Sequence, residues 1–174
     1  MLNVNVSIEL SDERPRQIER LLTYFKSAGD TDASLRWLWR LASASEGAGA
    51  REGVLERIVD YALNSADQRE QAEQALEQSS DPLPLLELFF EHDHHRGDRA
   101  LCCGHIDRMV EIIDAPVERD GWLTKELELA LAEPADLALA EHAVERATLK
   151  VVLIDPLVEA FLAQENYERA LHWL

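Results

Sequence analysis

Apolar residues recur along most of this chain at spacings of three and four, the period of an α-helix that buries one face. Short clusters of Gly, Pro, Ser, Asn and Asp separate these runs and are typical of turns. They predict about ten helices of roughly 8 to 16 residues, with no break long enough to be an interdomain linker. The sequence therefore predicts a single all-α domain over residues 1–174. The breaks lie at residues 29–31, 46–50, 65–67, 79–84, 93–98, 114–121, 133–136 and 165–166.

The helical pattern repeats along the chain. Segment 24–42 aligns with segment 160–174, and segment 89–110 joins them after a three-residue insertion. In segment 89–110, Cys102 takes the position of the small buried residue in the second helix. In the weaker copy anchored at Tyr61, Glu70 takes that position. Five anchors recur at an average spacing typical of a helical-repeat architecture: Phe25, Tyr61, Phe90, Ala130 and Phe161.

The last copy carries the clearest motif, with Phe161, Tyr167 and Ala170 at aromatic, aromatic and small positions within the run ENYERAL. This pattern resembles the tetratricopeptide repeat, a helix hairpin of about 34 residues that stacks into a solenoid. The chain departs from that family at Pro134, which replaces a turn glycine. The resemblance implies an all-α solenoid of about five stacked antiparallel hairpins. A general helical repeat or an irregular bundle is the alternative.

The family's inward-facing positions imply a concave groove that binds a protein or peptide. Apolar residues would line its centre and mostly acidic residues its C-terminal part, a combination that selects an apolar segment carrying Lys or Arg. Alternatively, Leu55, Val59 and Leu63 belong to the core. The groove residues implied in this way are Arg16, Glu19, Thr23, Lys26, Leu55, Val59, Leu63, Leu88, Glu91, His92, Glu128, Asp155 and Glu159.

The two ends of the sequence suggest further contacts. Apolar and polar residues alternate from Leu2 to Leu10, which predicts a short N-terminal strand or an extended arm over residues 1–11. A strand needs a partner, and the candidates are a second copy of this strand or residues 150–154. The last helix is short and leaves Leu171, Trp173 and Leu174 without a following cap. A homodimer, a partner protein or a longer repeat array could cover this end.

Histidine and cysteine residues cluster between positions 92 and 105. Imidazole and thiolate are preferred zinc ligands, so the alternative to a metal-free protein is a zinc site. No CxxC, HxxxH or HExxH spacing is present. The competing interpretation places Cys102 in the core and the loop histidines in solvent. The candidate ligands are His92, His94, His95, Cys102 and His105.

Composition excludes several classes of function. The chain has 34 Asp and Glu against 17 Lys and Arg, a formal net charge of −17 that repels phosphate backbones. We therefore expect no nucleic-acid partner. No run is long and apolar enough for a membrane span, and no signal-peptide pattern opens the chain, so we expect a cytoplasmic protein that does not bind membranes. Phosphate loops, nucleophile elbows and other catalytic motifs are missing, which argues against an enzyme.

These observations favour a non-catalytic scaffold, adaptor or assembly factor that binds a protein or peptide in a helical groove, with a basic segment as one candidate partner. One alternative is an acidic immunity-type or inhibitor protein that blocks a basic partner. Strong salt dependence of binding would distinguish this alternative from an apolar groove. Another is a metal-binding helical protein centred on His92 to His105.

Overall fold

A computed structural model describes residues 14–174, which form ten α-helices and no strand. The predicted all-α class is therefore confirmed over this range. The predicted strand or arm at residues 1–11 lies outside the described residues. No helix within the described range combines the length and apolar character that crossing a bilayer would require. The helices are α1 (Arg14–Ser27), α2 (Thr31–Ala44), α3 (Ala48–Leu63), α4 (Arg69–Gln78), α5 (Leu83–His95), α6 (Arg99–Ile112), α7 (Pro116–Leu131), α8 (Leu137–Arg146), α9 (Val151–Ala163) and α10 (Tyr167–Trp173).

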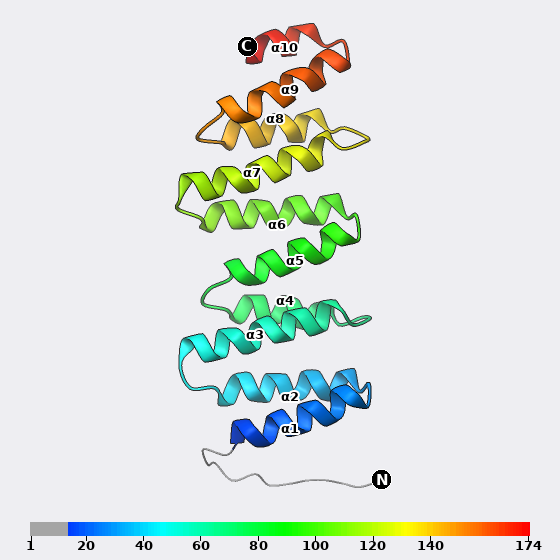
Figure 1. The fold of residues 1–174 in the computed structure, drawn as a ribbon, viewed down its shortest axis with the longest axis vertical. Helices are drawn as coiled ribbons and strands as arrows, with labels where there is room; N and C mark the ends of the chain where they lie inside the picture. The colour runs from blue at the N-terminus through cyan, green and yellow to red at the C-terminus, as the bar shows by residue number, and fades with distance from the viewer. Residues whose placement is uncertain (1–13) are drawn as a thin grey trace. The chain divides into compact units, whose positions relative to one another are not determined.

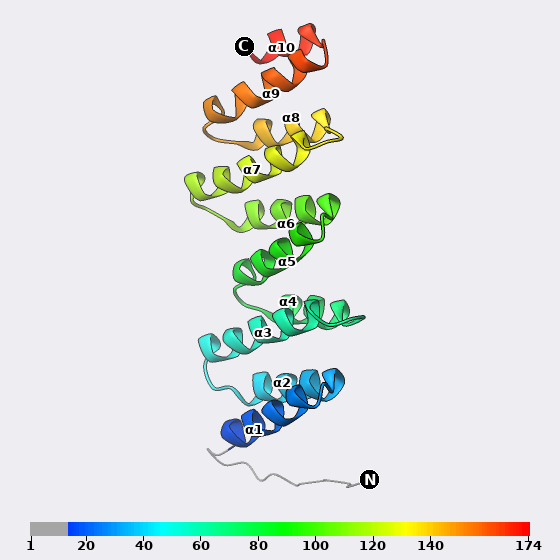
Figure 2. The same ribbon diagram turned by 45° about the vertical axis from the view of Figure 1, so that its right-hand side comes forward.

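The chain divides into two compact units, one ending at Leu88 and the other comprising Phe89–Leu174. In the first unit α1 packs against α2, α2 against α3, and α3 against α4. In the second unit α6, α7 and α8 pack in chain order, α9 contacts both α7 and α8, and α10 packs against α9. Within each unit, Figures 1 and 2 show successive helices running in opposite directions and joined by short turns.

Three of these turns share one backbone design. Gly29, Gly97 and Glu165 have φ values of 69°, 72° and 56°, the left-handed region that reverses the chain after a helix. The next residue in each turn is an N-cap whose side chain accepts a hydrogen bond from the backbone N–H three positions later. Such caps satisfy a donor that the helix itself leaves free. The caps are Asp30, Asp98 and Asn166.

Helix boundaries repeat along the chain at one fixed difference in numbering, which we call the repeat offset. Helix α2 begins at Thr31 and ends at Ala44, and α6 begins at Arg99 and ends at Ile112, 68 positions later at both ends. The pairs α3 and α7, and α4 and α8, show the same offset at both ends. We call residues 14–81 the first repeat and residues 82–149 the second repeat. Each repeat contains two hairpins, and residues 150–174 begin a third copy.

A carboxylate holds the loop after the fourth helix in both repeats. In the first repeat, Glu52 Oε1 accepts a hydrogen bond from the Ser80 N–H at 2.9 Å. In the second, Asp120 Oδ1 accepts from the Thr148 N–H at 2.9 Å, and Oδ2 accepts from the Leu149 N–H at 2.7 Å. Asp120 follows Glu52, and Thr148 follows Ser80, by the repeat offset. The repeat therefore extends from helix boundaries to individual hydrogen bonds.

Small residues lie four positions after the N-cap of the second helix in each hairpin and let the two helices approach closely. All are buried, with exposed fractions of 1% or less. Cys102 takes this place as predicted, but Glu70 does not, because the second hairpin is capped at Gln68 and its small residue is Ala72. The set comprises Ser34, Ala72, Cys102, Ala140 and Ala170.

The sequence alignment of the third hairpin is wrong by three positions. The Asp98 N–H bonds to the Asp93 carbonyl, as the Asp30 N–H bonds to that of Phe25. Asp93, and not Phe90, is therefore equivalent to Phe25, and no insertion is needed. The postulated pairing segment at residues 150–154 is also not a strand, because Val151 begins helix α9.

Candidate functional site

The polar residues predicted for the groove remain accessible, but its predicted apolar centre lies largely in the core. Leu55 and Val59 are fully buried and Leu63 is 7% exposed, so none of them lines an open groove. Leu88 and His92 are half-buried, as is Glu19, which forms an ion pair with Arg57. The remaining residues predicted for the groove are exposed: Arg16, Thr23, Lys26, Glu91, Glu128, Asp155 and Glu159.

The residues of the predicted zinc cluster do not converge on one point. Buried Asp93 contacts two of them, with Oδ1 3.1 Å from His92 Nδ1 and Oδ2 2.8 Å from His105 Nε2. His94 is exposed and stacks on the Phe90 ring, and His95 contacts the backbone carbonyl of its own helix. Within residues 14–174, no group of three potential ligands includes a member of this cluster.

The two cysteines are poor ligands and poor nucleophiles. Burial, reinforced by the Asp93 and Asp98 charges, raises the pKa of the Cys102 thiol to about 11. Burial and the nearby Glu126 carboxylate raise the pKa of the Cys103 thiol to about 11. Because metal binding and nucleophilic attack both use the thiolate, these side chains behave as small core residues. The sequence interpretation that places Cys102 in the core agrees with this geometry.

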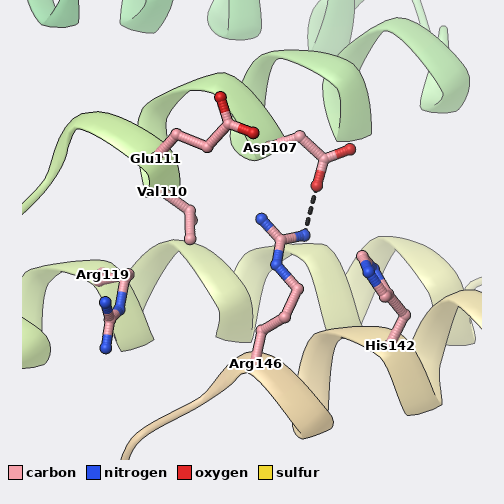
Figure 3. A pocket seen from close by; sticks show the side chains of 6 residues that line it. All are labelled: Asp107, Val110, Glu111, Arg119, His142 and Arg146. Carbon is pink, nitrogen blue, oxygen red and sulfur yellow. Dashed lines mark hydrogen bonds and ion pairs between the residues drawn. The ribbon is translucent and has the colours of Figure 1, made fainter.

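A different polar group, which we call the charged cluster, lies where α6, α7 and α8 meet. It consists of Asp107 from α6, Glu126 from α7, and His142 and Arg146 from α8. Arg146 Nη1 donates to Asp107 Oδ1 and lies 3.4 Å from Glu126 Oε2. One ligand atom each from Asp107, Glu126 and His142 lies within 4.8 Å of the others. Figure 3 shows the Arg146 guanidinium directed at Asp107, with His142 beside it.

Glu126 is the unusual member of the charged cluster. Its side chain is fully buried, and its Oε1 atom has no hydrogen-bond partner. Burial is the main cause that raises the pKa of this carboxyl to about 7; Arg146 opposes the rise and Asp107 adds to it. An unsatisfied buried oxygen of this kind costs free energy, so the fold alone gives no reason for a glutamate here.

The first repeat has other residues at the positions that correspond to the charged cluster. The residue that precedes Glu126 by the repeat offset is Ile58, which is fully buried in α3. Asp107 and Arg146 correspond to Trp39 and Gln78 at the same offset. The helix boundaries of the two repeats agree although this group of residues does not. The charged cluster is thus an addition to a framework that forms without it.

A shallow pocket opens over the charged cluster. It has a volume of about 530 Å³, and Figure 3 shows its lining side chains on α6, α7 and α8. Arg119 closes one side and donates from Nη2 to the Thr148 hydroxyl at 2.7 Å. The side chains of this pocket are predominantly charged. Its lining consists of Asp107, Val110, Glu111, Arg119, His142 and Arg146.

A second pocket, of about 440 Å³, lies between α5 and α7 within the second unit. Phe90, Leu129 and Ala132 give it an apolar wall, whereas His94, Lys125 and Glu128 contribute polar groups. The Lys125 ammonium lies 3.8 Å from the centroid of the Trp122 ring and 5.4 Å from that of Phe90, which holds it against the aromatic side chains. Glu128 is the one residue predicted for the groove that lines this pocket.

Sequence reasoning missed Asp107, Glu126, His142 and Arg146. They lie on three helices and form no local motif, and Glu126 sits in the ordinary amphipathic run KELELAL. The available signal was the comparison at the repeat offset, which sets Glu126 against Ile58. Alignment at the average spacing of a single hairpin could not reveal that difference.

No family model matches this chain, and neither a curated protein nor a solved structure is significantly similar to it. The informative comparison is therefore internal, between the first repeat and the second.

Proposed function

We propose that this chain is a non-catalytic helical-repeat scaffold, built of tetratricopeptide-like hairpins, that binds a basic peptide segment of a partner protein. The observation that carries the proposal is the pocket between α5 and α7. It combines an aromatic and aliphatic wall with the exposed Glu128 carboxylate. The bound segment would place one large apolar side chain against Phe90 and Leu129 and a neighbouring Lys or Arg beside Glu128.

The size and chemistry of the pocket support a side chain as the occupant. About 440 Å³ is enough for an aromatic or a branched aliphatic group, and the pocket is open to solvent on one side. Peptide recognition by helical surfaces commonly combines apolar anchors with flanking polar contacts. α5 and α7 also carry residues that the family resemblance implied for the groove, among them Glu91 and Glu128.

Charge supports the basic character of the partner. The net charge of −17 attracts positive segments and repels nucleic acid and acidic peptides over most of the surface. Lys125 keeps its positive charge over the Trp122 ring, so the selection for a basic segment depends on Glu128 and on the acidic surface of the chain. Binding should therefore weaken as salt concentration rises, while the apolar anchor keeps part of the affinity.

Selection of peptides from a phage-displayed random library on the full chain tests this function. We expect enrichment of sequences in which Phe, Leu, Ile or Trp is adjacent to Lys or Arg. The affinity of an enriched peptide would then be measured by fluorescence anisotropy. Glu128→Lys reverses the charge at the pocket and should weaken binding about fivefold or more, as loss of a complementary charge typically does.

Asp60→Lys is the matched control, because Asp60 precedes Glu128 by the repeat offset and is likewise exposed on the first repeat. It makes the same change in net charge at a residue that does not line the pocket, and it should alter affinity by less than about twofold. Equal weakening by the two variants would show only a general charge effect and would overturn the assignment of this pocket. Failure of the library to enrich apolar and basic sequences would overturn the proposed partner class.

A further inference from the structure

We propose that Asp107, Glu126 and His142 form a binding site for a divalent transition metal of the zinc class, distinct from the peptide pocket and from the histidines at positions 92 to 105. The three residues come from three different helices, α6, α7 and α8. Two carboxylates and one imidazole are a donor set that suits zinc and related ions better than magnesium, which prefers oxygen ligands alone.

The distances fit a site that needs only small side-chain adjustments. The three candidate ligand atoms lie within 4.8 Å of one another, whereas ligands around a tetrahedral zinc lie about 3.4 Å apart, given bonds of about 2.1 Å. His142 is exposed and Asp107 is half-buried, so both can rotate toward the buried Glu126. The three helices need not move, because burial holds the Glu126 side chain in place and the other two side chains can turn toward it.

Glu126 supplies an independent reason to expect a ligand. Its carboxylate is fully buried, yet Oε1 lacks any hydrogen-bond partner and Oε2 has only the 3.4 Å contact with Arg146. Buried charges normally pair fully or coordinate a metal. At the equivalent position the first repeat has Ile58, which needs no partner. A metal ion would satisfy the oxygen that the protein leaves unpaired.

Arg146 is the competing cation. In the structure its guanidinium contacts Asp107 and Glu126, the two carboxylates that the metal requires. Its side chain is 22% exposed and lines the pocket of about 530 Å³, which gives it room to turn away. Metal binding would therefore exchange one cation for another at the same carboxylates. Three protein ligands also leave a coordination position for water or a group that enters the pocket.

Zinc titration of the full chain tests the site. The protein is stripped of metal with chelator and titrated with ZnCl₂ by calorimetry, and Mg²⁺ serves as the comparison ion. We expect one zinc per chain and weaker binding of Mg²⁺. His142→Ala and Glu126→Ile should each reduce zinc affinity at least about tenfold, because each removes a ligand. Glu126→Ile installs the residue of the first repeat, so it is expected to fold.

Two further variants separate a metal site from a salt bridge. Arg146→Gln introduces the residue type of Gln78, its equivalent in the first repeat, and zinc affinity should rise severalfold because the competing cation is gone. His94→Ala removes an exposed histidine elsewhere and should leave the affinity unchanged. The proposal is wrong if neither the parent nor Arg146→Gln binds zinc at concentrations up to about 100 μM, or if binding survives both His142→Ala and Glu126→Ile.

Discussion

Replacement of Glu126 by glutamine should change how stability depends on pH. The pKa of this carboxyl is raised from 4.5 to about 7, first by burial. Between these values the folded chain holds a proton on Glu126 that the unfolded chain has lost, so rising pH lowers the free energy of unfolding. At about 1.4 kcal/mol per pH unit, the rise from pH 4.5 to about 7 lowers the free energy of unfolding by about 3 kcal/mol. Glutamine resembles the protonated acid in shape and does not ionise. The free energy of unfolding of the variant should therefore not fall over this pH interval.

Urea denaturation in the presence of chelator measures the effect. At pH 4 to 5, Glu126→Gln and the parent should have similar free energies of unfolding, within about 1 kcal/mol. At pH 8 the variant should be more stable, by up to about 3 kcal/mol. Glu128→Gln, which alters an exposed carboxylate on the same helix, should show no such divergence. A constant difference between Glu126→Gln and the parent, or a variant that is less stable at pH 8, would refute the reasoning and show that Arg146 keeps Glu126 ionised.

Two predictions concern polar groups that serve the fold. Asp93→Ala should lower the free energy of unfolding by about 3 to 5 kcal/mol, because it leaves the His105 imidazole buried without its carboxylate. The double variant Asp93→Phe, His105→Trp introduces the residue types of Phe25 and Trp37, which precede these positions by the repeat offset. It should recover most of the lost free energy of unfolding in the same urea assay. No recovery would contradict the equivalence of the hairpins. Asp120→Ala should cost about 1 to 3 kcal/mol, since it leaves the N–H groups of Thr148 and Leu149 without their acceptor. Hydrogen exchange at those two amides should accelerate, and unchanged exchange would show that the carboxylate does not hold the loop.

Helices and the turns between them could be predicted from the sequence because the signals are local. Apolar spacing and turn residues marked the helices, and the dipeptides at Gly29 and Gly97 marked two of the shared turns. The errors arose where one position had to be placed against another far away. The equivalence of Asp93 to Phe25 was missed, because a charged residue rarely takes the place of an aromatic residue. Its partner His105 was named as an alternative zinc ligand because histidines and cysteines cluster around it in the sequence.

The charged cluster could not be predicted, because its chemistry depends on burial. Glutamates are usually solvated on helices, and nothing next to Glu126 in sequence indicates that it faces α6 and α8. The groove prediction erred in the opposite direction, since Val59 and Leu63 are apolar and α3 presents them to neighbouring helices instead of a partner. In both cases the rotation of a helix about its axis decided the outcome, and that rotation is set by tertiary packing.

The spacing of the N-caps constrains how chains of this design can change in length. Longer and shorter intervals alternate along the series of caps, which are Asp30, Gln68, Asp98, Asp136 and Asn166. Gain or loss of a single hairpin inside the series would place two long or two short intervals between caps next to each other. The alternation of longer and shorter intervals would then be broken at that point. Only a step of one full repeat preserves the order of turns, caps and loop contacts. Descendants of such a chain would grow or shrink by pairs of hairpins, and a metal site in one pair could be inherited, lost or multiplied without disturbing the others.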